Sequence, residues 1–202
     1  MYVQTNQASG NAIAIFNRST DGALILSTTV LTGGLSTGAE LGSEGSVILS
    51  NDGRWLFSTN AGSNEISAFR VDANGLTLVN KAASGGTLPI SLASYKNLLY
   101  VLNAGGSGNI TGFIVDESGK LTPLAGSTLP LSNNDVGAAP GPAQASFSPD
   151  GKMLIVSEKA TSMIDTYAVG KDGLASGPTG SSIFRNYAVW FCFHATRRID
   201  CL

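Results

Sequence analysis

A short sequence unit recurs four times in this chain, and this repetition restricts the possible folds more than any other feature. Each copy contains an isoleucine followed three residues later by an aromatic residue, and the four isoleucines are Ile13, Ile66, Ile110 and Ile164. Subtraction of these numbers gives separations of 53, 44 and 54 residues. A period of about 40 to 50 residues with about four strands per copy is typical of the blades of a β-propeller.

The second copy shows the unit most clearly. A turn at Asp52-Gly53 precedes an apolar run, and a second glycine-containing turn precedes an alternating run. In the alternating run Ile66 and Ala68 face one way, whereas Phe69 and Val71 face the other, as the period of two in a strand requires. Two antiparallel strands joined by tight turns are therefore predicted.

The same scheme predicts the strands of the whole chain. The first copy lacks its innermost strand, and the last strand of the fourth copy begins at Leu174 and breaks off at Ser176-Gly177-Pro178. The predicted fold class is all-β, a β-propeller with about four four-stranded blades at 1–180 and a tail at 181–202 outside the repeat. The predicted strands are 2–6, 12–16, 23–30, 46–49, 55–59, 66–71, 76–79, 90–93, 98–102, 110–115, 121–124, 144–147, 153–156 and 164–169.

Two segments between copies, 31–44 and 125–142, are rich in Gly, Ser, Pro and Asn and are predicted to be loops. In an antiparallel blade, the loop that enters the first strand and the end of the second strand lie on the same face of the disc. The Asp-Gly turns lie on the opposite face. Both long loops are therefore expected beside the ends of the second strands, at Asn6, Asn60, Asn103 and Glu158.

The tail from Ser181 to Leu202 differs from the repeats, because it is rich in aromatic residues and has no turn signal at the expected place. It contains the only histidine, His194, and both cysteines, Cys192 and Cys201. Their spacing matches no standard zinc-ligand pattern, so no metal site is predicted and the cysteines are interpreted as free thiols. A shifted reading frame or an unnatural terminus is the preferred explanation of this segment.

Composition excludes several classes of partner. The chain is 43% apolar and only 13% charged, with a formal net charge of −2 and scattered Lys and Arg residues. No basic stripe is present to bind a phosphate backbone, so nucleic acid is not an expected partner. No apolar run is long enough to span a membrane, and Met1 leads directly into a predicted strand without a leader sequence. A cytoplasmic location is therefore the default expectation.

The segment Ser148-Pro149-Asp150-Gly151 with the strand that follows it, together with strands such as 99–103, resembles the seven-bladed lactonase family of β-propellers. That family includes 6-phosphogluconolactonase and carboxymuconate cyclase, and the resemblance covers residues 2 to about 177. It implies hydrolysis or formation of a lactone ring at the channel mouth, without a cofactor, and a small lactone or sugar acid as ligand. The alternative is a non-catalytic propeller that binds a ligand or a protein through the same face.

The number of copies has a consequence of its own. Seven blades of about 44 residues require about 300 residues, whereas this chain has about four blades. The preferred interpretation is a fragment of a seven-bladed parent, and the alternative is closure with four blades. A fragment leaves apolar blade faces without a partner, so self-association through these faces is expected.

The resemblance also implies which residues form the site. His, an acidic residue and Arg are expected at the channel mouth. The segment 142–147 contains no His, and no Arg lies between Glu158 and Ile164. Glu158 alone matches, and it is the predicted acid-base residue. The alternative interpretation of Glu158 is a solvated carboxylate at a strand end, paired with Lys159 or with a nearby backbone amide.

Further residues are predicted to bind substrate because they lie at strand ends on the same face. For Asn60 and Asn103, the alternative is that their side chains form hydrogen bonds within their own loops. No phosphate-binding glycine loop and no Gly-x-Ser-x-Gly elbow with a partner histidine are found, so neither a nucleotide cofactor nor Ser-His-Asp chemistry is predicted. The predicted substrate-binding residues are Glu44, Asn60, Asn103, Gln144 and Lys159.

Overall fold

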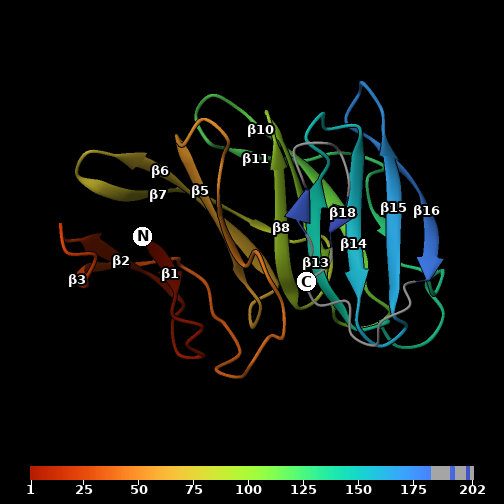
Figure 1. Cartoon of the computed structure of the whole chain (residues 1–202), viewed down its shortest axis with the longest axis horizontal. Helices are drawn as coiled ribbons and strands as arrows, with labels where there is room; N and C mark the ends of the chain where they lie inside the picture. Colours follow the sequence, from red (N-terminus) through yellow and green to blue (C-terminus); the bar gives the residue numbers. More distant parts are fainter. Residues whose placement is uncertain (183–191, 194–198, 201–202) are drawn as a thin grey trace.

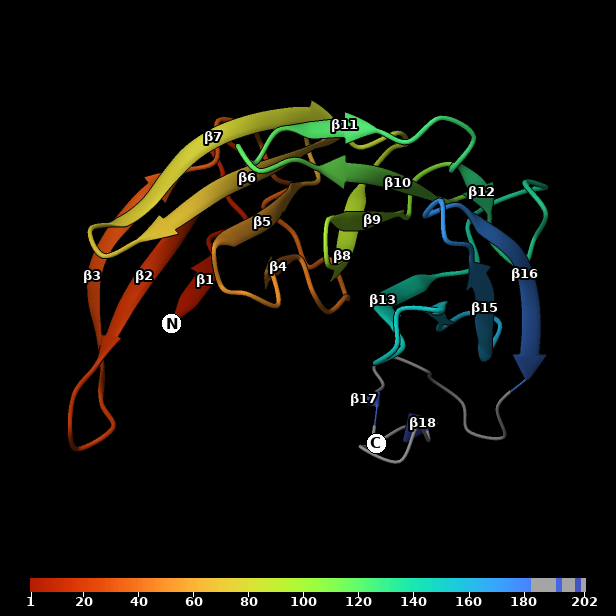
Figure 2. The same cartoon turned by 90° about the horizontal axis from the view of Figure 1, so that it is seen from above.

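The computed structural model describes residues 1–182, 192–193 and 199–200, and in these residues every regular element is a β-strand. Four antiparallel sheets follow one another along the chain (Figure 1) and are arranged as an arc (Figure 2). The sheets are the four predicted blades, so the chain is an all-β partial propeller with four blades of a seven-bladed architecture. In this described part, no helix has the length and apolar character needed to cross a membrane.

The first two blades follow the predicted strand order. Blade one has three strands in this chain, and blade two has four. Blade one consists of β1 (Tyr2–Gln4), β2 (Ala12–Arg18) and β3 (Leu24–Leu31), and blade two of β4 (Val47–Leu49), β5 (Trp55–Asn60), β6 (Glu65–Asp72) and β7 (Gly75–Ala83).

Blades three and four are also meanders of consecutive antiparallel strands. Blade three carries one additional short strand that pairs with its third strand. Blade three consists of β8 (Pro89–Tyr95), β9 (Leu98–Asn103), β10 (Asn109–Val115), β11 (Leu121–Pro123) and β12 (Leu129–Pro130), and blade four of β13 (Pro142–Phe147), β14 (Met153–Glu158), β15 (Met163–Val169) and β16 (Ala175–Ser182).

In blades two and three, the repeated Ile-x-x-aromatic step joins the blade to both of its neighbours. Residues separated by three positions in a strand point to opposite faces of the sheet. Ile66 packs in the apolar cluster between blades two and three, whereas Phe69 packs in the cluster between blades one and two. Ile110 and Phe113 are divided in the same way between blades four and two. The residues of the sequence repeat are therefore those that pack neighbouring blades against each other.

Three features differ from the sequence expectation. β16 continues through Ser176-Gly177-Pro178 to Ser182 instead of breaking off, because it is an outer strand with a register shift opposite Thr166 and Ala168, where proline is tolerated. The predicted loop 125–142 contains β12, which pairs with the end of β10 that the short β11 leaves open. In blade one, Thr5 and not Asn6 corresponds to Asn60, because Thr5 N bonds Ala12 O where the pairing of β1 continues.

The predicted boundary between repeat and tail falls within a strand. Ser181 and Ser182 belong to β16, and β17 (Cys192–Phe193) pairs with β18 (Ile199–Asp200). The remaining residues of the predicted tail, including His194 and Cys201, lie outside the described residues.

The predicted position of the long loops is confirmed. In the first loop, Gly34 packs against the side chain of Asn60 and Leu35 O accepts a hydrogen bond from Gly62 N. In the second loop, Ser132 donates hydrogen bonds to Glu158. The ends of the second strands and both loops thus share one face of the propeller, which we term the loop face, and the Asp-Gly turns form the opposite turn face.

The Asp-Gly turns of blades two and four, on the turn face, are built alike. In blade four, Ser148 Oγ donates to Asp150 Oδ1 at 2.8 Å and accepts from Met153 N at 3.0 Å. Gly151 then adopts a φ of 70°, which is unfavourable for residues that have a Cβ. Blade two repeats the turn, with Gly53 at a φ of 69°. The surroundings differ, because a Cβ on Gly151 would lie 2.1 Å from Tyr95 Cε1, whereas Gly53 has nothing within 4 Å.

We therefore expect Gly151→Ala to destabilise the fold more than Gly53→Ala. Both substitutions place a Cβ in the left-handed region, at a cost of about 1 to 2 kcal/mol. Gly151→Ala additionally forces the packed ring of Tyr95 to move, which adds about 1 to 3 kcal/mol. Urea unfolding of the two variants measures the difference, and equal losses would mean that the ring moves freely.

Candidate functional site: the loop face of the channel

The innermost strands β4, β8 and β13 form the concave side of the arc, which is the wall of the channel (Figure 2). They are directly connected, because Leu92 N donates to Gly45 O and Ala145 N donates to the buried Ser91 Oγ at 3.0 Å. A groove of about 320 Å³ runs along this wall. Its lining includes Gly45, Ile48, Leu92, Ser94, Gln144 and Ser146.

The segment 41–44 connects the first loop to blade four at the loop face. Ser43 Oγ donates to Ile90 O at 3.1 Å, and Glu44 N donates to Ala143 O at 3.0 Å. Lys159 Nζ donates to Gly42 O. These contacts bring three predicted binding residues together: Glu44 is exposed, while Gln144 and Lys159 are half-buried.

The two predicted asparagines lie elsewhere, in the seams between blades. Asn60 is fully buried, with its Oδ1 accepting from Asn11 Nδ2 at 3.0 Å and from Thr32 Oγ1 at 2.6 Å. Its Nδ2 donates to Ser67 Oγ at 2.8 Å.

Asn103 is buried in the same way. Its Nδ2 donates to Ser84 O at 3.2 Å and to Asn109 Oδ1 at 2.8 Å. Gly86 packs against this side chain as Gly34 packs against Asn60. Both asparagines therefore bind the loop that leaves the preceding blade and a strand of their own blade.

Glu158 ends β14 and is 0% exposed. Its Oε1 accepts from Ser132 N at 3.2 Å, and its Oε2 accepts from Ser132 Oγ and Thr161 Oγ1, both at 2.6 Å. The alternative interpretation is thus correct about a backbone amide partner and wrong about solvation. Lys159 does not pair with Glu158 in the observed contacts, because its ammonium binds Gly42 O.

Asp165, on β15, lies beside Glu158 and was not predicted. Asp165 is the register partner of Val156, so it shares a face of the sheet with Glu158, two residues further on. It is 0% exposed, and no well-aligned N–H or O–H of the described residues reaches either of its oxygens. Burial is the main cause that raises the pKa of Asp165 to about 7, with the hydrogen bond and charge of Glu158 next and a small opposing effect of the Ser132 amide.

A signal for Asp165 does exist in the sequence. It follows the isoleucine of the repeated step, where the other copies have Ala14, Ser67 and Thr111. An acidic residue at a position that is otherwise small and neutral marks blade four as different from the rest.

Tyr167 lies on the apolar side of the pair formed by Glu158 and Asp165. It is fully buried, and its hydroxyl donates to Pro130 O at 2.8 Å. Burial raises the pKa of Tyr167, and the nearby charges of Asp165 and Glu158 raise it further. The tyrosine is therefore a neutral hydrogen-bond donor at any ordinary pH.

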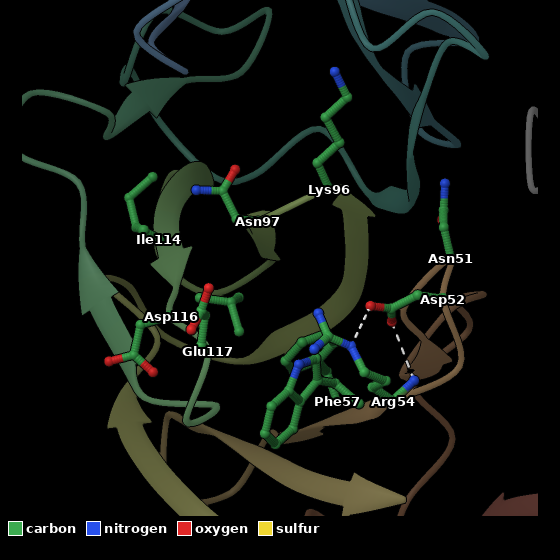
Figure 3. Close-up of a pocket in the computed structure, with 11 residues that line it drawn as sticks. Asn51, Asp52, Arg54, Phe57, Lys96, Asn97, Ile114, Asp116 and Glu117 are labelled. Carbon is green, nitrogen blue, oxygen red and sulfur yellow. Dashed lines mark hydrogen bonds and ion pairs between the residues drawn. The ribbon is translucent and has the colours of Figure 1, made fainter.

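A larger hollow, of about 700 Å³, lies on the turn face between blades two and three (Figure 3). Arg54 and Asp52 point toward each other there, with Arg54 Nε 2.6 Å from Asp52 Oδ2, while Asp116 and Glu117 lie on another side. Hydrogen bonding from Ser50, and then from Arg54, lowers the pKa of Asp52 to about 2.

A similar hollow of about 400 Å³ lies between blades three and four and is lined by Lys96, Asp150 and Lys152. Such grooves recur where neighbouring blades diverge toward the turn face. None of the predicted site residues lies in either of them.

Four antiparallel blades arranged as an arc, with their innermost strands on the concave side, define part of a β-propeller. The family model described as "Lactonase, 7-bladed beta-propeller" matches residues 9–130, which is more than half of the chain. The chain belongs to this lactonase family.

Solved structures show the same fold. A protein from Lactobacillus plantarum has 21% identity and a TM-score of 0.78, over 97% of this chain and 58% of that one. The periplasmic gluconolactonase PpgL of Pseudomonas aeruginosa has 19% identity and a TM-score of 0.74, over 98% of this chain and 58% of that one. A putative 6-phosphogluconolactonase from Bacteroides fragilis has 19% identity and a TM-score of 0.66, over 98% and 62%.

The chain thus spans about three fifths of the length of these structures. A comparison with curated protein sequences gave no significant match.

The seam position of Asn60 yields a prediction. Asn60→Ala leaves Thr32, Asn11 and Ser67 with buried polar groups that have lost a partner, which costs about 2 to 4 kcal/mol of stability. Glu44→Ala, at an exposed position on the same face, is the matched control and should change stability by less than about 0.5 kcal/mol. Chemical unfolding measures both values. If Asn60→Ala lowered the free energy of unfolding as little as the control, a structural role for Asn60 would be contradicted.

Proposed function

We propose that this chain is the major part of a lactonase-type propeller that acts on a lactone ring, by hydrolysis or cyclisation, at the loop face of the channel and without a cofactor. The observation that carries the proposal is membership of the lactonase family, combined with the polar groups gathered at that face. The solved structures named above include a gluconolactonase and a putative 6-phosphogluconolactonase. The proposed ligand is therefore a small lactone or sugar acid.

The side chains near segment 41–44 suit such a ligand. An ammonium has three N–H donors, and Gly42 O accepts from Lys159 Nζ. An ammonium with remaining donor capacity can bind a carboxylate or hydroxyl oxygen of a sugar acid. We propose Lys159, Gln144 and Glu44 as substrate-binding residues. The two buried asparagines, Asn60 and Asn103, have a structural role in this proposal, because they stabilise the loop face from the seams between blades.

We propose that Glu158 is the acid-base residue and acts through Thr161. The carboxylate is fully buried, so a substrate does not reach it directly. The exposed Thr161 bridges this gap, because its hydroxyl donates to Glu158 Oε2 at 2.6 Å. An attacking water gives its proton to Thr161 Oγ1 while the threonine proton passes to Glu158. The hydroxide equivalent adds to the lactone carbonyl. The proton held by Glu158 then returns through Thr161 to the ring oxygen as the bond between this oxygen and the carbonyl carbon breaks and the ring opens.

This mechanism predicts that Glu158→Gln and Thr161→Val each lower the rate of gluconolactone hydrolysis by a factor of about 10² to 10⁴, the usual contribution of general base catalysis. Thr161→Ser keeps the hydroxyl and should keep most of the activity. Acid release at constant pH gives the rates, and the spontaneous hydrolysis of the lactone is subtracted. Equal rates for Thr161→Val and Thr161→Ser would exclude the relay.

One observation favours the second candidate, a binding propeller without catalysis. The His and Arg that the family resemblance implies are absent from the corresponding segments, 142–147 and 159–163. Calorimetric titration with gluconate separates the two functions. Binding that depends on Lys159, without any lactone turnover, would establish the binding propeller in place of the lactonase.

We also propose that copies of the chain associate through the open face of blade one. β2 and β3 expose Leu24 and Leu26 there, at 47% and 56%, and β1 exposes Val3. Phe16, the register partner of Leu26, lies on the same face. Leu26→Lys should shift the chain toward monomer in sedimentation velocity. Ile25→Lys is the matched control, because Ile25 is equally exposed but its side chain alternates to the other face.

A further inference from the structure

We propose that Glu158 and Asp165 hold a single proton between them, and that this proton fastens the inter-blade segment at Leu131-Ser132 to the end of β14. The inference concerns groups of the chain itself and needs no ligand. It therefore stands or fails independently of the proposed lactonase activity.

The distribution of donors assigns the proton to Asp165. Glu158 accepts three hydrogen bonds, two from Ser132 and one from Thr161, which is the environment of a carboxylate anion. Asp165 has no well-aligned donor among the described residues, although it is fully buried. A buried carboxyl group without donors is stable as the neutral acid, and its O–H then needs an acceptor. The adjacent carboxylate of Glu158 is that acceptor.

Blade two contains the neutral equivalent of this pair. Asn60 occupies the position of Glu158 and Ser67 that of Asp165, and Asn60 Nδ2 donates to Ser67 Oγ at 2.8 Å. The pair also binds the loop of the preceding blade, because Ser67 Oγ donates to Thr32 O at 2.8 Å. In blade four, Glu158 binds Ser132 of the preceding loop in the corresponding way. In blade two the bridging hydrogen belongs to the amide of Asn60 and is not lost when the pH changes. In blade four the bridging hydrogen belongs to a carboxyl group and can be lost as the pH rises.

The charges around the pair do not compensate a second negative charge. β14 contributes Glu158, and β15 contributes Asp165 and the neutral Tyr167. β16 packs against Asp165 with Gly180, and the segment 130–132 contributes only Pro130 O and the Ser132 donors. Within residues 1–182, no Lys or Arg forms an ion pair with either carboxyl group. Loss of the proton therefore places two like charges together in a buried site.

The direction of the pH effect follows from linkage. The folded chain holds the proton of Asp165 up to about pH 7, whereas an unfolded aspartate has a pKa of 3.8. Between these values the folded state binds one more proton than the unfolded state, so stability decreases as the pH rises. The stabilisation is complete below about pH 4 and is lost as the pH passes 7. For one proton, the folding constant falls up to tenfold per pH unit in this window.

Asp165→Asn tests the shared proton, because an amide N–H replaces the titratable O–H and still donates to Glu158. In the full chain, urea unfolding from pH 5 to pH 7 should show a loss of the folding constant approaching tenfold per pH unit in the parent, and a much flatter profile in Asp165→Asn. Asp172→Asn, at an exposed position of the same blade, is the control and should follow the parent. Identical pH profiles for Asp165→Asn and the parent would overturn the proposal.

Two measurements on the parent chain do not depend on the variant. The infrared spectrum at pH 6 should contain the carbonyl band of a protonated carboxyl group, and this band should disappear as the pH passes 7. Hydrogen exchange at the Ser132 amide, corrected for the intrinsic effect of pH, should lose protection over the same range because this amide donates to Glu158. A Ser132 amide whose protection does not change between pH 6 and pH 8 would show that the segment is held without the proton.

Discussion

The packing of apolar sheet faces between neighbouring blades is the interaction on which the rest of the structure depends. The third strands of blades two and three supply it in both directions, with the isoleucine on one face and the aromatic residue on the other. Phe69, Phe113 and Tyr167 are fully buried in three successive seams. Because each blade contacts only its neighbours, stability is built up seam by seam along the arc. The polar positions at the ends of the seams can therefore vary between blades while the packing is retained.

That freedom explains the difference between blade two and blade four. The end of each second strand meets the loop from the preceding blade and must satisfy that loop's polar groups. Asn60 does this with neutral hydrogen bonds to Thr32 and Ser67. Glu158 does it as an acceptor of three hydrogen bonds, next to a second carboxyl group. The same architectural position thus holds a neutral amide in one blade and an ionisable carboxyl group in another.

The sequence predicts the blades well, because each strand and turn is encoded locally and then repeated. It also predicts that Glu158 lies beside the second loop, since strand order fixes which ends meet. The burial of Glu158 is not predictable in this way, because it depends on Ser132, 26 residues earlier in the chain. Asp165 is not identified from the sequence, because alternation places it on an apolar face. The length of β16 is underestimated from the sequence, because Gly177-Pro178 in isolation signals a turn, although an outer strand tolerates this pair.

The loop face depends on a connection across the channel. Blade four alone supplies Gln144, Glu158, Lys159 and Thr161, whereas Glu44 comes from the segment that joins blades one and two. That segment is attached to blade four through Glu44 N and Ala143 O and through Lys159 Nζ and Gly42 O. Leu41 packs against the apolar cluster between blades three and four. The candidate site is therefore sensitive to the curvature of the arc, because a change in the angle between blades pulls segment 41–44 away from Lys159.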